Sequence, residues 1–419
     1  MNTVIAAFLT MTALLLSPSA TQAAWVIEPT LELTSGYDDN VRLREQNEQD
    51  AIVTTATAQA QMRSLTERSE IALVAGAGYV AYSNVGDGET PADDIDNEDV
   101  QYLRLRAHRD TDRTQWGLTG SARRDQVFRR ITRILDPLDG SLADSTPGAI
   151  GVDDDRSFED SLDTDDVDFS AVRDQARRIR FEVSPYLQVA FSERSNARVS
   201  LVRSQRFFDS DGERLGLRNT QTTGADVTFD RAMSPLASVN LTVGYALLES
   251  DGREDSDTYR ATIGWRQRLS AATEVAIDVG ANQVENDLVD ETLLAYRISA
   301  TRNMPLSRFL VQVERSAIAS PFGGVVEADR VSARYRRSIS DRVEFNLSIY
   351  GYRSERIGAG TEEEREYVDL SPELFWRMTP NWSVGGAYTF RWTDRQERAG
   401  TATSNGVSVS LRYQPPRRI

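Results

Sequence analysis

Residues 257–269 read DTYRATIGWRQRL, and this stretch alternates between two kinds of side chain. Tyr259, Ala261, Ile263 and Trp265 occupy every second position, while the arginines of the stretch occupy the positions between and after them. A period of two indicates an extended strand with two unlike faces. One face is apolar and ends in aromatic rings, and the other is cationic.

The same alternation recurs along the rest of the chain. We count about eighteen such segments of roughly 10–14 residues, whereas a soluble strand averages about 5–6 and a tilted membrane-spanning strand needs about 9–11. No comparable stretch repeats at the helical period. The sequence therefore predicts an all-β protein whose strands are long enough to cross a membrane.

The links between segments alternate between short and long. SLTER (64–68), DTDR (110–113) and SERSN (192–196) are short, whereas DDNVRLREQNEQD (38–50) and NVGDGETPADDIDNED (84–99) are long and acidic. This asymmetry is typical of an up-and-down antiparallel transmembrane barrel with short periplasmic turns and long extracellular loops. We expect about eighteen strands, with sixteen as the alternative, and both termini in the periplasm.

The charged face of each strand must then be the inner one. An arginine facing lipid near the membrane midplane would cost about 2–4 kcal/mol. The apolar face of 257–269 is therefore expected to meet lipid, and its arginines to line a wet lumen. The expected pore-lining residues are Arg104, Arg106, Arg180, Arg198, Arg206, Arg260, Arg266, Arg268, Arg297, Arg334, Arg336, Arg391, Tyr350 and Tyr352. Arginine and acid could brace the wall by pairing across strands, or the arginines could attract anionic solutes.

Composition narrows the possible functions. The chain has 419 residues, a formal net charge of −16 and no cysteine. An acidic chain is a poor partner for nucleic acid, and the absence of cysteine excludes disulfides and thiol chemistry. Residues 1–23 resemble a secretory signal peptide, because an apolar run from Val4 to Leu16 is followed by small residues. We expect the barrel to span 24–413 and a periplasmic tail to span 414–419.

The link near 126–176 is the longest, and its acidic residues are concentrated in one short run. These residues are Asp153, Asp154, Asp155, Glu159, Asp160, Asp163, Asp165, Asp166 and Asp168. One hypothesis is that the loop folds inward and constricts or gates the channel, because an acidic loop would be attracted to an arginine wall. The alternatives are a solvated loop, or a loop that binds Ca²⁺ or Mg²⁺ bridging to lipopolysaccharide. The spacing of an EF-hand is absent.

A barrel enzyme is a less favoured class. The chain has one histidine, His108, and alternation places it on the lumen side near a short periplasmic turn. Known barrel hydrolases use a histidine paired with a serine or an acid to move protons. We expect His108 to be an ordinary hydrogen-bonded lumen residue. No catalytic residue, metal site or cofactor is predicted.

Two stretches resemble a known family. IEPTLELTSGYDDNVRL (27–43) has an apolar-Pro-x-Leu start followed by Tyr-Asp-Asp-Asn, and SNGVSVSLRY (404–413) resembles the C-terminal signal that the barrel assembly machinery recognises. The candidate signal residues are Gly406, Val409, Leu411 and Tyr413. Together with the strand spacing, these stretches resemble β-barrel porins of exopolysaccharide biosynthesis and export systems in Gram-negative bacteria.

The resemblance implies an outer-membrane conduit for exopolysaccharide export. The alternatives are a passive uptake porin for small solutes, including anionic ones, a barrel enzyme, or a surface structural protein that binds cations. Expected partners are outer-membrane lipid and lipopolysaccharide, the barrel assembly machinery, polysaccharide and periplasmic export components. Nucleic acid is not expected. The expected location is the outer membrane of a Gram-negative bacterium.

Overall fold

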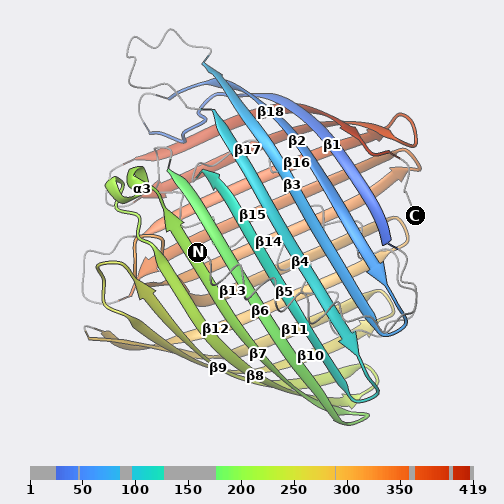
Figure 1. The fold of residues 1–419 in the computed structure, drawn as a ribbon, viewed down its shortest axis with the longest axis vertical. Helices are drawn as coiled ribbons and strands as arrows, with labels where there is room; N and C mark the ends of the chain where they lie inside the picture. The colour runs from blue at the N-terminus through green and yellow to red at the C-terminus, as the bar shows by residue number, and fades with distance from the viewer. Residues whose placement is uncertain are drawn as a thin grey trace.

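The chain forms a closed barrel. The computed structural model describes residues 25–45, 48–84, 97–126, 176–287, 289–357, 364–395 and 400–415. Within them, eighteen antiparallel strands make one sheet that closes on itself (Figure 1). The expected all-β transmembrane-type barrel and its eighteen strands are confirmed, and the alternative of sixteen strands is wrong.

The strands follow one another around the barrel in chain order. The first nine are β1 (Trp25–Asp38), β2 (Ala51–Leu65), β3 (Ser69–Asn84), β4 (Glu98–Asp110), β5 (Thr114–Gln126), β6 (Arg177–Ser192), β7 (Ser195–Phe208), β8 (Thr220–Ser234) and β9 (Ala237–Ser250). The other nine are β10 (Ser256–Ser270), β11 (Thr273–Asn286), β12 (Val289–Met304), β13 (Ser307–Ala319), β14 (Val325–Ser340), β15 (Val343–Arg356), β16 (Arg365–Arg377), β17 (Trp382–Arg395) and β18 (Thr401–Tyr413).

Closure occurs between the first strand and the last. Each strand pairs with its chain neighbours, and β1 pairs with both β2 and β18. At this seam Leu31 lies opposite Tyr413 and Asp38 lies opposite Gly406. A closed sheet leaves no unpaired strand edge, which a structure surrounded by lipid requires.

The strands are longer than we expected. They contain 13–16 residues, because several continue past the apolar band at the end that carries the long loops. In β14, Val331 and Tyr335 share a face with Glu327 and Asp329, which lie closer to that end. Acidic side chains on the outward face are compatible with the outer headgroup region but not with hydrocarbon.

The outward face is recognised by its exposed apolar side chains. Leu241, Ile263 and Val279 lie opposite one another on β9, β10 and β11, and the exposed fraction of Ile263 is 61%. Aromatic residues lie on this face near both ends of the strands, as in the girdles of membrane barrels. The girdle near the short turns contains Trp25, Trp116, Phe229, Trp265, Phe309, Phe345, Trp376, Trp382 and Tyr413. The girdle near the long loops contains Tyr37, Tyr79, Phe207, Tyr245, Tyr259, Tyr296, Tyr388, Phe390 and Trp392.

Helical structure is scarce in the described part of the chain. The short helix α3 (Ser210–Arg214) lies between β7 and β8 at the long-loop end (Figure 1). None of the helices in the described ranges is long and apolar enough to cross a membrane. The predicted signal peptide, the acidic residues from Asp153 to Asp168 and the last four residues of the predicted tail lie outside the described residues.

Candidate functional site in the barrel interior

The strand register places the predicted pore-lining residues on one face. Arg260, for example, lies opposite Gly244 and Asn282, on the face opposite exposed Ile263. In a closed barrel this is the inner face. The residues that share it are Arg104, Arg106, Arg180, Arg198, Arg206, Arg260, Arg266, Arg268, Arg297, Arg334, Arg336, Arg391, Tyr350 and Tyr352.

Most of the inner wall is braced by ion pairs between strands. Arg260 contacts Asp226 at 2.6 Å, and Arg336 contacts Glu344 at 2.9 Å. The carboxylate of Glu314 accepts from Arg297 at 3.3 Å. Such pairs neutralise charge and hold strand register, because arginine presents a rigid fork to a carboxylate.

Several inner-face charges were missing from the predicted set. Arg178 donates to both carboxylate oxygens of Asp125 at 3.0 and 2.9 Å, and both side chains are 2% exposed. Arg123 also contacts Asp125, at 2.7 Å, and Arg63 contacts Glu70 at 2.8 Å. Strand alternation could have located these arginines, but their partners depend on the register.

The wall formed by β4 to β7 carries more positive than negative charge. Its inward arginines are Arg104, Arg106, Arg123, Arg178, Arg180, Arg198 and Arg206. Its inward carboxylates are Glu98, Asp110, Asp125 and Glu182. Arg123, Arg180 and Arg206 lie directly opposite one another on three adjacent strands. Aligned like charges are unfavourable by themselves, and Arg123 and Arg180 contact Asp125 at 2.7 Å and Glu182 at 3.1 Å, so carboxylates offset part of the positive charge of this row.

Arg106 is a source of positive potential on this wall. It lies opposite Ala72 on β3 and Thr119 on β5, neither of which carries charge. Across the described residues, no hydrogen-bond or ion-pair partner is found for its guanidinium. Its charge is therefore available to a solute in the lumen.

Two inward tyrosines lie flat against the wall because a glycine faces each of them. A methyl group at Gly117 would collide with the ring of Tyr186, and the guanidinium of Arg198 lies 3.8 Å from the centroid of that ring. Tyr102 covers Gly76 in the same way. At Gly117, the glycine, Tyr186 and Arg198 thus form a stack in which the ring lies against the wall and the guanidinium lies against the ring.

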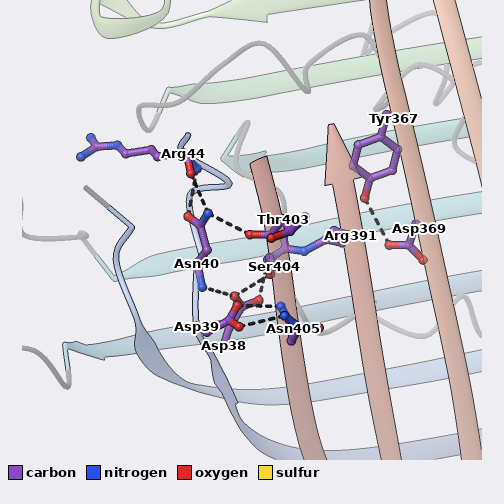
Figure 2. Close-up of polar contacts among 10 residues, drawn as sticks. All are labelled: Asp38, Asp39, Asn40, Arg44, Tyr367, Asp369, Arg391, Thr403, Ser404 and Asn405. Atoms are coloured by element: carbon purple, nitrogen blue, oxygen red, sulfur yellow. Dashed lines mark hydrogen bonds and ion pairs between the residues drawn. The ribbon is translucent and has the colours of Figure 1, made fainter. Parts of the chain in front are cut away.

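The first long loop turns into the barrel. The side chain of Asn40 donates to the carbonyls of Arg44 at 2.7 Å and Thr403 at 2.9 Å, and it accepts from the Arg44 amide at 2.9 Å. Figure 2 shows this segment beside β18, with Asp39 bonded to Asn405. The Tyr-Asp-Asp-Asn motif therefore fixes the loop to the closing strand.

At Leu43 the loop contacts residues of β15 and β16. Leu43 packs with Tyr350, Tyr352 and Tyr367, and its own exposed fraction is 5%. Its φ of 50° is a left-handed conformation that is rare for leucine. The surrounding contacts must hold this strained residue in place. Tyr350 and Tyr352 are consequently covered by the loop, so these two predicted pore-lining residues are not open to the lumen.

Two other long loops meet above the lumen. The Arg218 amide, between α3 and β8, donates to the Pro321 carbonyl between β13 and β14 at 2.9 Å. Phe322 packs against buried Leu217, and the Arg365 guanidinium lies 4.7 Å from its ring centroid. These contacts join the loop before β8, the loop before β14 and the start of β16. The expected constriction by residues 126–176 lies outside the described ranges.

His108 lies near two carboxylates beside a short turn. Its Nε2 lies 4.0 Å from carboxylate oxygens of Glu70 and Asp110. Strand register places it on the inner face, opposite Gly117. Within the described ranges, no group of three or more His, Cys, Asp or Glu residues could hold a metal ion.

The closed barrel, its apolar outer face and its charged interior define an outer-membrane β-barrel of the porin type. Residues 21–133 match the family model described as Putative beta-barrel porin 2, and the resemblance to a β-barrel porin family is confirmed over this part of the chain. No curated protein matches the chain.

Solved structures are similar to the chain at low sequence identity. The chain is similar to OccAB4 of Acinetobacter baumannii, with 10% identity, 94% of this chain and 99% of that chain covered, and a TM-score of 0.43. It is also similar to OccK7 (OpdD) of Pseudomonas aeruginosa, with 9% identity and a TM-score of 0.46, and the match covers 94% of this chain and 99% of that chain. A third similar structure is the FrpB iron transporter of Neisseria meningitidis, with 8% identity and a TM-score of 0.46, and the match covers 94% of this chain and 83% of that chain.

Proposed function

We propose that the chain is an outer-membrane channel for the passive uptake of small anionic solutes. The observation that carries this proposal is the surplus of arginine on the inner wall formed by β4 to β7. Arg106 lies there without a partner among the described residues, and Arg198 is held in place over Tyr186. Arginine stays charged at every physiological pH, so such a wall lowers the barrier for anions and raises it for cations.

The size of the barrel supports passage through it. Barrels of 16 to 18 strands are wide enough to leave an aqueous channel. The inward-turned segment at Asn40 and Leu43 narrows the mouth on one side only, since both residues attach to strands near the seam. A positively charged wall favours anions, and a partly narrowed mouth favours small solutes. Small carboxylates meet both conditions, whereas bulky neutral molecules meet neither.

A solute-entry assay in liposomes tests the proposal. The purified chain is reconstituted, and entry of glucuronate is compared with entry of glucosamine, a sugar of similar size and opposite charge. Faster entry of glucuronate is expected. Arg106→Gln combined with Arg198→Gln should reduce this preference, whereas Arg203→Gln, an outward-facing change, should leave it unaltered. Equal entry of both sugars, or faster entry of glucosamine, would overturn the proposal.

Export of exopolysaccharide is the competing function, and its support is the family resemblance of the two terminal strands. Loss of polymer secretion after deletion of the coding sequence would favour export, whereas loss of growth on one anionic nutrient would favour uptake. Conductance adds a second discriminator. A full chain that is silent but conducts after deletion of residues 130–172 would indicate a gated export conduit.

Catalysis has less support than passage. The site around His108 lies on the inner face near a short turn, and the two groups that approach its Nε2 to 4.0 Å are the carboxylates of Glu70 and Asp110. Loss of a lipase or protease activity in His108→Ala would overturn the assignment as a channel without catalytic function.

A further inference from the structure

The short turns present apolar residues at their tips. The exposed fractions of the side chains are 53% for Leu236, 65% for Leu306 and 58% for Ile339. These residues belong to the hairpins β8–β9, β12–β13 and β14–β15. Two tips are fixed to the neighbouring strand, because the carbonyls of Leu236 and Leu306 accept from the amides of Arg268 and Ser338 at 2.8 Å.

Ordered apolar tips indicate where this end of the barrel lies in the membrane. Short turns of outer-membrane barrels face the periplasm. An exposed leucine or isoleucine is stabilised by about 1.5–3 kcal/mol when it leaves water. The tips therefore lie within the headgroup region of the periplasmic leaflet rather than in bulk water.

Each of the three hairpins also carries an outward-facing arginine close to its tip. Arg231 lies opposite Val239, Arg302 opposite Phe309 and Arg337 opposite Phe345. All three side chains are exposed. An arginine at this depth lies between girdle aromatics and apolar tips, at the boundary of hydrocarbon and headgroups.

These three arginines differ from most of those on the inner face. Where the structure is described, Arg231, Arg302 and Arg337 have no hydrogen-bond or ion-pair partner. Inner-face arginines such as Arg260 and Arg336, by contrast, contact carboxylates. The anion that occurs at the depth of the short turns is the phosphate of a phospholipid, which arginine binds through two parallel hydrogen bonds.

We propose that the hairpins β8–β9, β12–β13 and β14–β15 form a belt that binds the phosphates of periplasmic-leaflet phospholipids. Arg231, Arg302 and Arg337 bind the phosphates, while Leu236, Leu306 and Ile339 lie among the headgroups on the periplasmic side of these arginines. The belt holds one side of the barrel at a fixed depth. This inference is independent of the solute that passes through the lumen.

Native mass spectrometry of the full chain tests the belt. The probe lipids are dioleoyl-phosphatidylglycerol and a dioleoyl monogalactosyl lipid, which has the same chains but no phosphate. The wild type should retain phosphatidylglycerol in preference to the galactolipid. The triple variant Arg231→Gln, Arg302→Gln and Arg337→Gln should bind phosphatidylglycerol about tenfold more weakly per site, as expected for loss of a charge-assisted contact.

The matched control removes the same charge from the other end of the barrel. Arg214→Gln, Arg253→Gln and Arg356→Gln alter exposed residues at the long loops and should leave retention of phosphatidylglycerol unchanged. Folding is checked by the heat-dependent shift in gel mobility. If the triple variant does not fold, each single variant should lose one bound lipid. Wild-type retention by the variants, or equal retention of the galactolipid, would overturn the proposal.

Discussion

The carboxylate of Asp38, at the end of β1, pairs with the guanidinium of Arg391 on β17, across the intervening strand β18. The side chains are 0% and 1% exposed, respectively. Ser404 on β18 joins them, because it donates to Asp38 at 2.7 Å and accepts from Arg391 at 2.7 Å. Figure 2 shows these contacts at the outer end of the seam. The first strand and the last two are thus fastened where the barrel closes.

Asp38→Asn should destabilise the barrel by about 3–5 kcal/mol, because it removes the charge of the buried carboxylate that contacts the Arg391 guanidinium. The measurement is the urea midpoint of the folded form in detergent. Asp257→Asn is the matched control, since Asp257 accepts from Tyr245 in an exposed pair. The control should change stability by about 1 kcal/mol or less. Equal effects of the two changes would contradict a fastening role for Asp38.

Leu43→Ala should release the inward-turned segment and raise single-channel conductance. Removing a buried leucine side chain costs about 2–5 kcal/mol. Leu43 also has a strained left-handed backbone, so the loop depends on the contacts of this side chain to keep its inward conformation. Glu48→Ala, an exposed change in the same loop, should leave conductance unchanged. If Leu43→Ala conducts like the wild type, this segment does not limit the mouth.

Gly117→Ala should destabilise the fold by about 1–3 kcal/mol, the usual range for overpacking. The added methyl group collides with the ring of Tyr186 and displaces Arg198 with it. Adding Tyr186→Ser to the same chain should restore stability. Gly386→Ala is the control, because a methyl group there has no atom within 4 Å. A harmless Gly117→Ala would show that the ring can move at no cost.

Ile263→Arg should impair folding into lipid vesicles more than Thr262→Arg. Ile263 is on the outward face, where an arginine at the midplane costs about 2–4 kcal/mol, while Thr262 is on the inner face. The readout is the folded fraction by gel mobility after dilution into vesicles. Similar yields for the two variants would contradict the assignment of the two faces.

The number of strands, and whether each strand residue points into or out of the barrel, could be predicted from the sequence because side chains alternate between the two faces with a period of two. Ile263 and Arg260 differ in parity, and the cost of charge in lipid then assigns inside and outside. The alternation of short and long links predicted the up-and-down order of the strands, because membrane barrels have short turns at one end and long loops at the other. These are properties of each strand by itself, so one sequence suffices.

Contacts between distant segments could not be predicted in this way. Asp38 and Arg391 are 353 residues apart, and their pairing depends on the register at the seam. The inward turn at Leu43 depends on a left-handed residue and on tyrosines from β15 and β16, and the loop has no periodic pattern to indicate either. Arg106 was predicted to be inward, but its lack of a partner became visible only once the neighbouring strands were placed.

The most direct test of the proposed anion channel is the reversal potential of a single channel in a planar bilayer under a gradient of potassium chloride. The arginine surplus on β4 to β7 predicts a reversal potential with the sign of chloride selectivity. Arg106→Gln should move it towards zero. A potential with the sign of potassium selectivity, in a channel whose folding has been verified, would contradict a lumen governed by these arginines.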